Sequence, residues 1–329
     1  MGLRWGFVGL GRIAEAFATD LKLVAGSVIQ AVGSRSGVRS TEFGAKVGSL
    51  RAYDSYIGVF TDPDVDIVYI ASTHDSHAEL AIQALDHGKH VLCEKPLAVN
   101  RRQAEAMVAA SRRNHRFLME AFWTRFNPAF SEVLSRCRAG DLGEIRYVSG
   151  DFAFRVDPSP GGRLFDLATA GGSLLDVGVY PLFLAYSVLG IPDEVTARMI
   201  RHPSGVDWQL AMILSYPSAQ AVLYSGFASR SSLVATISGR DGRFGLGPVW
   251  HECDEYRHLP EGSPDEEQIS RPRTGRGFVH EIQECQACIA DGRIESDSWS
   301  HTDSLALLAM ADAVRDVVGL RYPFETGDL

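Results

Sequence analysis

The segment Gly6-Phe7-Val8-Gly9-Leu10-Gly11-Arg12-Ile13-Ala14 carries the pattern GxGxxA, and this pattern decides the fold of the first part of the chain. A strand-like apolar run precedes it and a helix-length segment follows it, which is the context of a phosphate-binding turn. Gly9 permits a tight turn, Gly11 lets a pyrophosphate approach the backbone, and Ala14 is small enough for close helix–strand packing. The N–H groups at the start of the helix then face the phosphate charge. The alternative is a plain tight turn without a ligand.

Outward from this turn, strand-like runs alternate with helix-length segments. The strand-like runs are Leu3–Val8, Val28–Val32, Ile67–Ser72, His90–Cys93 and Phe117–Ala121. The helix-length segments between them include Arg12–Val24, Ser76–His87 and Asn100–His115. This alternation predicts an α/β fold with a doubly wound parallel sheet, a Rossmann domain over residues 1–121, whose ligand lies at the carboxyl ends of the strands.

The pattern changes after residue 121, where long alternating runs predict antiparallel strands. These runs are Glu144–Phe154, Glu194–Ile200, Leu210–Tyr216, Ala219–Phe227 and Leu233–Ser238. Helices are predicted at Pro128–Arg138, Gly172–Leu189, Gly277–Asp291 and Asp303–Val318, and an exposed loop at Gly262–Gly277. Residues 122–329 are therefore predicted to form an α+β domain with a large, mostly antiparallel open sheet.

Composition narrows the class of protein. The chain has 329 residues, which fits two domains, and a formal charge of −9. This acidity, without a compensating basic stretch, argues against nucleic acid or anionic membrane as a partner. The five cysteines indicate free thiols, and the start of the chain carries no secretion signal, so a cytoplasmic location is expected. No cluster has the spacing of a metal site, and Cys285 and Cys288 fit a helix face better than a zinc or redox pair.

The end of the second strand indicates which dinucleotide binds. NAD-binding proteins usually place an acidic residue there, about 20 residues past the glycines, to bind the ribose hydroxyls. This chain has Ser34 and Arg35 instead, with Arg39 one turn later. A guanidinium suits a 2′-phosphate, so the sequence predicts NADP in preference to NAD. The alternative is that both arginines are merely solvated.

Two further segments follow strands at the predicted ligand edge. Glu94-Lys95-Pro96 ends the run that begins at His90, which places Lys95 at the carboxyl edge of the sheet. Residues Ser72–His77 follow the run that begins at Ile67 and reach the same edge.

These residues resemble the glucose–fructose oxidoreductase, inositol dehydrogenase and MocA (Gfo/Idh/MocA) family over nearly the whole chain. The matching segments are Gly9–Ala14, Ser72–His77, Glu94-Lys95-Pro96 and Gly171–Tyr180. Within the family, Met119–Phe126 and Arg163–Asp166 resemble the branch of dimeric dihydrodiol dehydrogenases, which also oxidise D-xylose with NADP. The chain departs from many members in having Tyr180 where they have His, and His74-Asp75 where they have Pro-Asn.

The resemblance implies that Lys95, Asp176 and Tyr180 are the catalytic group. Asp176 and Tyr180 are four residues apart, so in a helix they share one face. An unperturbed tyrosine has a pKa of about 10, and a nearby cation such as Lys95 lowers that value. Tyr180 is then expected to take the proton of a substrate hydroxyl as hydride leaves for the nicotinamide, with Asp176 orienting the sugar or the lysine. This expectation requires Lys95 and Tyr180 to act beside the same ring.

The remaining site predictions divide into two sets. The cofactor-binding residues are expected to be Gly9, Gly11, Arg12, Ile13, Ser34, Arg35, Arg39, Ser72, Thr73, His74, His77, Glu94 and Lys95. The substrate-binding residues suggested by the dihydrodiol branch are Trp123, Phe154, Arg163 and Phe278, although each aromatic residue also suits an ordinary core. No metal is predicted.

The sequence therefore predicts an NADP-dependent oxidoreductase acting on a hydroxyl or carbonyl of a sugar, polyol or cyclic trans-diol. A non-catalytic dinucleotide-sensing regulator of the same fold is the alternative, and an assembly protein that uses the open sheet is a third reading. The resemblance also implies a homodimer or homotetramer formed through that sheet. The sequence fixes neither the exact substrate nor the reaction direction, because specificity depends on a few pocket contacts.

Overall fold

The computed structural model describes residues 2–157 and 162–326, and the chain divides into two compact units. The first unit contains Met1–Phe126 and Thr274–Leu305, and the second contains Asn127–Arg273 and Ala306–Leu329. The segment Thr274–Leu305, far along the chain, thus belongs to the first unit.

The first unit is built on a six-stranded sheet in the order β3-β2-β1-β4-β5-β6, with all neighbouring strands parallel. Its strands are β1 (Arg4–Val8), β2 (Val28–Gly33), β3 (Arg51–Tyr53), β4 (Ile67–Ile70), β5 (His90–Glu94) and β6 (Leu118–Ala121). This order is the doubly wound one, so the predicted Rossmann fold is confirmed. The prediction missed β3, because its three residues are partly or fully exposed and carry no apolar run.

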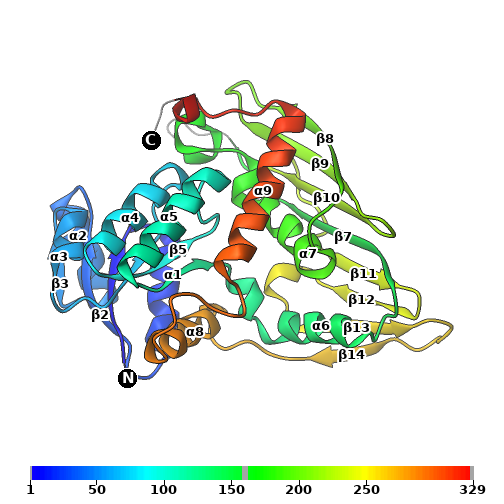
Figure 1. The fold of residues 1–329 in the computed structure, drawn as a ribbon, viewed down its shortest axis with the longest axis horizontal. Coiled ribbons are helices and arrows are strands. Elements are labelled where there is room, and N and C mark those ends of the chain that lie inside the picture. Colours follow the sequence, from blue (N-terminus) through cyan, green and yellow to red (C-terminus); the bar gives the residue numbers. More distant parts are fainter. Residues whose placement is uncertain (1, 158–161, 327–329) are drawn as a thin grey trace. The chain divides into compact units, whose positions relative to one another are not determined.

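Helices complete the first unit (Figure 1). They are α1 (Arg12–Leu21), α2 (Gly37–Val47), α3 (Tyr56–Thr61), α4 (His77–Asp86), α5 (Arg101–Asn114) and α8 (Phe278–Ala290). The helix from the returning segment packs against the helix that follows the glycine turn, with the rings of Phe17 and Phe278 5.9 Å apart. Asp20, at the end of α1, accepts the backbone N–H groups of Arg276 and Phe278 and thereby caps the start of α8.

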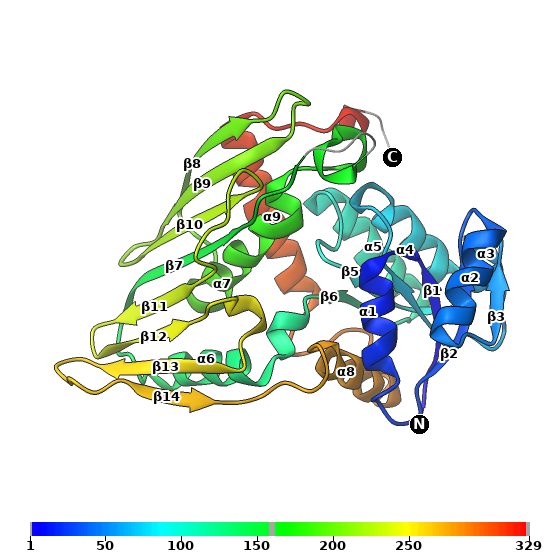
Figure 2. The same cartoon turned by 180° about the vertical axis from the view of Figure 1, so that it is seen from behind.

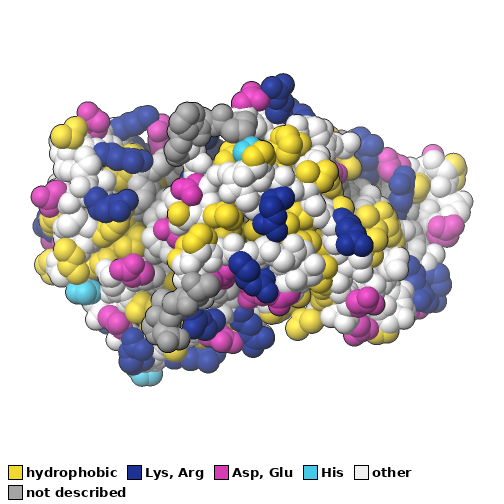
Figure 3. Space-filling view, turned by 90° about the horizontal axis from the view of Figure 1, so that it is seen from above, with side chains coloured by type: hydrophobic (Ala, Val, Ile, Leu, Met, Phe, Trp, Pro, Cys, Tyr) yellow, Lys and Arg dark blue, Asp and Glu magenta, His cyan; other side chains and the backbone are white. Residues whose placement is uncertain are grey.

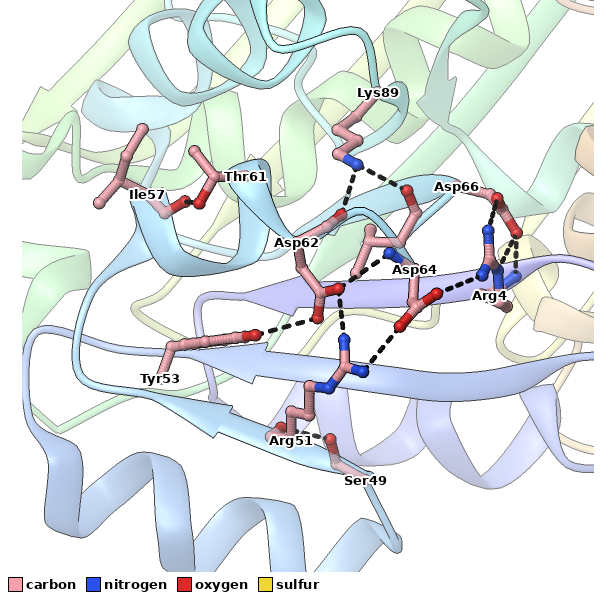
Figure 4. Close-up of polar contacts among 11 residues, drawn as sticks. Arg4, Ser49, Arg51, Tyr53, Ile57, Thr61, Asp62, Asp64, Asp66 and Lys89 are labelled. Carbon is pink, nitrogen blue, oxygen red and sulfur yellow. Dashed lines mark hydrogen bonds and ion pairs between the residues drawn. The ribbon is translucent and has the colours of Figure 1, made fainter.

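The amino ends of the parallel strands are joined by a polar network (Figure 4). Asp64 accepts hydrogen bonds from Arg4, the first residue of β1, and from Arg51, the first residue of β3, at 2.9 and 2.7 Å. Asp66, directly before β4, accepts from Arg4 at 2.8 Å. The buried Lys89, directly before β5, donates to two backbone carbonyls of the same loop. This network stabilises the strand ends opposite the predicted ligand edge.

The second unit is built on an eight-stranded sheet in the order β14-β13-β12-β11-β7-β10-β9-β8. Its strands are β7 (Ile145–Ala153), β8 (Glu194–Arg201), β9 (Asp207–Ser215), β10 (Gln220–Gly226), β11 (Ala235–Gly239), β12 (Gly242–Leu246), β13 (Glu255–Pro260) and β14 (Glu267–Ser270). In the part of the chain that the structure describes, β7 and β10 form its one parallel pair. The predicted large, mostly antiparallel sheet is confirmed. The exposed loop predicted at Gly262–Gly277 was wrong in part, because β14 lies within it.

Helices cover one face of this sheet, as Figures 1 and 2 show. They are α6 (Pro128–Ala139), α7 (Val179–Leu189) and the later part of α9 (His301–Val318). The strands bury alternate residues toward these helices, while four apolar residues on the opposite face are 40–56% exposed. This open-face patch consists of Tyr147, Ile200, Ile213 and Val222. Val222 lies directly opposite Ile213 in the register of β10 and β9.

The helix predicted at Gly172–Leu189 has two parts. Leu174–Gly178 forms a π-helical turn, and α7 begins at Val179. Pro181 therefore lies in the first turn of α7, where a missing backbone N–H costs little. The stretch Leu167–Leu189 is long and apolar enough to cross a membrane by composition, but it contains Asp176, and 78% of its apolar window is buried inside the fold. We interpret it as a core helix.

Charged side chains of both signs are interspersed on the face seen in Figure 3, without a large patch of one sign. Among the described residues, no group of three or more histidine, cysteine or acidic side chains is arranged to hold a metal ion.

Candidate active site

The glycine turn lies between β1 and α1 and fits the phosphates of a dinucleotide. Gly9 has a φ of +85°, and a Cβ there would lie 2.3 Å from the backbone of Ala71 and Ser72, so only glycine fits. A Cβ at Gly11 would meet no atom within 4 Å, so the space above this residue is open. The start of α1 has no side-chain cap, which leaves its backbone N–H groups available to an anion. Arg12 and Ile13, in the first turn of α1, are exposed.

The end of β2 presents the residues predicted to select the cofactor. Arg35 and Arg39 are exposed, and Ser34 is 9% exposed. Arg39 donates from Nη2 to the carbonyl oxygen of Leu10 at 2.8 Å, which places its guanidinium beside the glycine turn. No carboxylate occurs between Ser34 and Arg39, and the guanidinium groups of Arg35 and Arg39 are the charged groups of this segment.

The segment after β4 forms a short 3-10 turn at His74–Ser76 and is held by internal hydrogen bonds. Ser76 donates from Oγ to the carbonyl oxygen of Thr73 at 2.8 Å, and its Oγ lies 2.8 Å from that of Ser72. Ser72 and Thr73 remain partly exposed, whereas His74 is 6% exposed.

His77 is fully buried and connects this segment to the loop after β5. Its Nδ1 lies 2.8 Å from the carbonyl oxygen of Pro96, and its Nε2 lies 3.2 Å from that of Ser72. A carbonyl oxygen only accepts, so the shorter contact places a hydrogen on Nδ1. Burial lowers the pKa of His77. The imidazole therefore joins two loops at the carboxyl edge of the sheet rather than facing that edge directly.

Lys95 directly follows β5 and is partly exposed at the same edge as the glycine turn. Its backbone N–H donates to Oε2 of Glu94 at 3.2 Å, while Oε1 of Glu94 accepts the hydroxyl of Tyr69 at 2.6 Å. Glu94 is only 6% exposed, and burial raises its pKa. Burial and the neighbouring Glu94 carboxyl raise the pKa of Tyr69 well above its usual value. The Glu94 side chain is thus turned into the fold, and it holds the backbone that carries Lys95.

In the second unit, the segment that carries Asp176 and Tyr180 is anchored to β9. Gly172 has a φ of +119°, and a Cβ there would lie 1.9 Å from Oδ1 of Asp207. Oδ2 of Asp207 accepts the Ser173 hydroxyl at 2.8 Å and the Leu174 backbone N–H at 2.6 Å. Burial raises the pKa of Asp207 to about 6. This anchor fixes the start of the π-helical turn, a helix form that is frequent at functional sites.

Asp176 lies within that turn and is 8% exposed, and Tyr180 lies at the start of α7 and is 5% exposed. Arg163 donates from Nη2 to Oδ1 of Asp176 at 2.9 Å. The structure thus brings together a residue predicted to bind substrate and one predicted to be catalytic.

Aromatic side chains surround Tyr180. The rings of Phe152 and His251 lie 5.3 and 5.0 Å from the ring of Tyr180, and they stack on each other at 4.0 Å. The ring of Phe154, the residue directly after β7, lies 6.1 Å from that of Phe152, which belongs to β7. The prediction named Phe154 but missed Phe152, although two residues along a strand point to the same face. His251 follows an irregular connection after β12, and no sequence periodicity marks it.

Trp123 and Phe278, the other two predicted substrate residues, lie in the first unit. They are 8% and 5% exposed, their rings are 5.3 Å apart, and both belong to a buried apolar cluster. The predicted catalytic residues are likewise divided, with Lys95 in the first unit and Asp176 and Tyr180 in the second.

Comparisons with known proteins show the family of this chain. Residues 3–122 match the family model described as oxidoreductase family, NAD-binding Rossmann fold, and residues 130–245 match the GFO/IDH/MocA C-terminal domain. The chain is 34% identical to trans-1,2-dihydrobenzene-1,2-diol dehydrogenase from Sus scrofa, over 98% of this chain and 99% of the relative.

Two solved structures share the whole fold. A 3-ketoreductase from Actinomadura kijaniata, in complex with NADP and TDP-benzene, has a TM-score of 0.87 at 28% identity. An aldose-aldose oxidoreductase from Caulobacter crescentus, complexed with glycerol, has a TM-score of 0.88 at 26% identity. Each comparison covers 97% of this chain and 98% of the other chain. The glycine turn, the Glu94-Lys95-Pro96 loop and these matches over both units agree, and the chain belongs to the Gfo/Idh/MocA family of oxidoreductases.

Proposed function

We propose that this protein is an NADP-dependent oxidoreductase that acts on a hydroxyl or carbonyl of a sugar, polyol or cyclic trans-diol. The observation that carries the proposal is that one edge of the parallel sheet presents both an open phosphate cradle at Gly11 and an amine at Lys95. The relatives named above, a diol dehydrogenase, a ketoreductase and an aldose oxidoreductase, support the substrate class.

The residues present fit a dinucleotide. The backbone N–H groups at the start of α1 would hold the pyrophosphate, and Arg35 and Arg39 would bind the 2′-phosphate of NADP. When bound, the nicotinamide supplies the hydride acceptor or donor. In our proposal, Ser72, Thr73 and His74 line the cofactor side of this edge, while Glu94 and His77 fix the loops that flank it.

The chain itself supplies the proton chemistry. Tyr180 takes the proton of the substrate hydroxyl during oxidation and returns it during reduction. The Lys95 ammonium favours the phenolate form of that tyrosine, because an opposite charge stabilises an anion. Asp176, held by Arg163, orients the substrate or the lysine. In our proposal, Phe154, Arg163, Trp123 and Phe278 contact the substrate.

We further propose that the first unit binds the dinucleotide and that the second binds substrate and a second copy of the chain. The open-face patch supports self-association, because its four apolar side chains are exposed and two of them, Ile213 and Val222, lie side by side.

A direct assay tests the proposed activity. NADP and NAD are each incubated with trans-1,2-dihydrobenzene-1,2-diol, D-xylose and other aldoses, and the absorbance of the reduced nicotinamide is followed. We expect turnover with at least one of these substrates and a preference for NADP. Tight dinucleotide binding without turnover on the whole panel would instead support a non-catalytic sensor.

A further inference from the structure

The carboxyl group of Glu120 lies inside the first unit and joins three segments of the chain. Glu120 belongs to β6 and is 1% exposed. Its Oε1 accepts the backbone N–H of Leu97 at 2.8 Å, and its Oε2 accepts the indole N–H of Trp299 at 3.0 Å and the Ser304 hydroxyl at 2.6 Å. Burial of a carboxyl group is costly unless hydrogen bonds compensate, so these three donors account for its presence.

The Leu97 N–H belongs to the peptide group that joins Pro96 to Leu97. The other end of this peptide group, the Pro96 carbonyl, lies 2.8 Å from Nδ1 of His77. One residue earlier, the Lys95 N–H donates to Glu94 at 3.2 Å. The backbone on both sides of Lys95 is thus held by buried ionisable side chains, and Glu120 provides the contact on the carboxyl side.

We propose that Glu120 is a positioning residue that fixes the backbone after Lys95 and thereby sets where the Lys95 ammonium lies. This inference rests on the proposed role of Lys95 in the reaction. A lysine side chain has many rotamers, so a loosened backbone adds further to the positions that its ammonium group can take. A displacement of about 1 Å in a reacting group can cost about a hundredfold in rate. Glu120 thus acts on the reaction through the Leu97 peptide.

Two kinds of effect have to be separated, the hydrogen bond to Leu97 and the negative charge near Lys95. The variant Glu120→Gln removes the charge and has one accepting oxygen, for which the N–H groups of Leu97 and Trp299 compete. The additional change Trp299→Phe removes that competition, because the amide oxygen can then face Leu97 while the amide nitrogen donates to Ser304. Met at position 120 has a similar length but offers Leu97 no comparable acceptor.

The decisive comparison is therefore between Glu120→Gln/Trp299→Phe and Glu120→Met/Trp299→Phe. Both lack the charge and the indole donor, and they differ in the acceptor that is available to Leu97. With NADP and trans-1,2-dihydrobenzene-1,2-diol, we expect kcat of the Gln pair to stay within about threefold of Trp299→Phe alone. We expect kcat of the Met pair to fall about 10- to 100-fold. Equal kcat values for the two pairs would overturn the inference.

The pH profile distinguishes positioning from a general structural defect. A displaced ammonium no longer favours the phenolate of Tyr180, so the rise of kcat/KM for oxidation should move to higher pH by about one unit in the Met pair. A merely structural defect would lower kcat/KM evenly at every pH, and that result would also contradict the inference. Hydrogen exchange of the Leu97 amide gives a readout without turnover, and we expect faster exchange in the Met pair than in the Gln pair.

A third background separates this inference from the proposed function. In Lys95→Met, the difference between Gln and Met at position 120 should disappear, because both changes act through the same amine. Full activity of Lys95→Met itself would reject the proposed function. If Lys95→Met is inactive but the Gln and Met pairs that retain Lys95 have equal kcat values, only the role of Glu120 is rejected. Should the Met pair fail to fold, Glu120→Asn/Trp299→Phe replaces it, because this shorter amide also lacks the charge and withdraws the acceptor from Leu97.

Discussion

Arg163 donates a hydrogen bond from Nη2 to Oδ1 of Asp176 at 2.9 Å, and the two side chains differ in exposure. The side chain of Arg163 is 47% exposed and that of Asp176 is 11% exposed. Solvent screens such a pair, so its contribution to stability is small. The hydrogen bond instead fixes the direction of the nearly buried Asp176 carboxylate, four residues before Tyr180 in the chain.

The first prediction follows from this pair. Arg163→Ala should lower kcat/KM about tenfold, because Asp176 loses the charged hydrogen bond that orients it. The melting temperature should barely change. Arg155→Ala is the matched control, since Arg155 pairs with Asp157 at 2.7 Å but its side chain is 72% exposed. Steady-state kinetics of the two variants check this, and equal effects would contradict a specific role for Arg163.

The second prediction concerns the proposed catalytic group. Tyr180→Phe and Lys95→Ala should each lower kcat at least about a hundredfold, the usual scale for acid–base groups. NADP affinity, measured by fluorescence titration, should change much less in Tyr180→Phe. Tyr216→Phe is the control, because its hydroxyl donates only to the backbone carbonyl of Gly190 in the contacts that the structure describes. Full activity of Tyr180→Phe would remove the tyrosine from the mechanism.

The third prediction concerns the choice of dinucleotide. Arg35→Ala and Arg39→Ala should each weaken NADP binding about 10- to 100-fold, the scale of a lost charge-assisted hydrogen bond. The affinity for NAD, which lacks the 2′-phosphate, is the internal control. It should hold in Arg35→Ala and fall slightly in Arg39→Ala, because Arg39 also bonds Leu10 in the glycine turn. Wild-type protein that binds NAD as tightly as NADP would contradict the proposed preference.

The fourth prediction concerns Glu281, a fully buried residue of α8. Neither of its carboxyl oxygens has a hydrogen-bond partner among the described residues, and burial raises its pKa well above the usual value. The folded protein therefore keeps this proton at a pH where the unfolded chain, with a pKa of about 4.3, has released it. The stability contributed by this group is complete below that pH and is lost as pH rises toward the folded pKa, by at most about 1.4 kcal/mol per pH unit.

Glu281→Met should therefore raise the free energy of unfolding, and the gain should be larger at pH 8 than at pH 5. Chemical denaturation at both pH values measures this. Glu281→Gln is the control, because it also removes the titration but keeps a buried polar group and should give a smaller gain. An equal gain at both pH values would show that ionisation of Glu281 plays no part.

The fifth prediction concerns self-association through the open-face patch. Val222→Lys/Ile213→Lys places two charges side by side on neighbouring strands of that face and should yield the mass of a single chain in light scattering. Val317→Lys is the control, because Val317 is 51% exposed on α9, the helix that packs on the other face of the sheet. A wild-type protein that is already monomeric would contradict the proposed oligomer.

The sequence by itself determined the features that local patterns encode. Strand, glycine turn and helix follow one another within about 20 residues around Gly9, so the phosphate cradle and the parallel sheet are visible in the order of residues. The large second sheet was also visible in its longest alternating strands. The strands β3, β12, β13 and β14 were not predicted, because their three to six residues are too few for a clear periodicity.

The tertiary structure alone decided the contacts between distant residues. Glu120 and Leu97 are separated by 23 residues, and Glu120 and Ser304 by 184, yet they share one buried carboxyl group. The packing of Thr274–Leu305 in the first unit and the pairing of Arg163 with Asp176 are likewise contacts that local sequence patterns do not encode. Such contacts depend on how helices and strands pack once distant parts of the chain have come together. Local periodicity does not predict that packing, because it reports only the spacing of neighbouring residues.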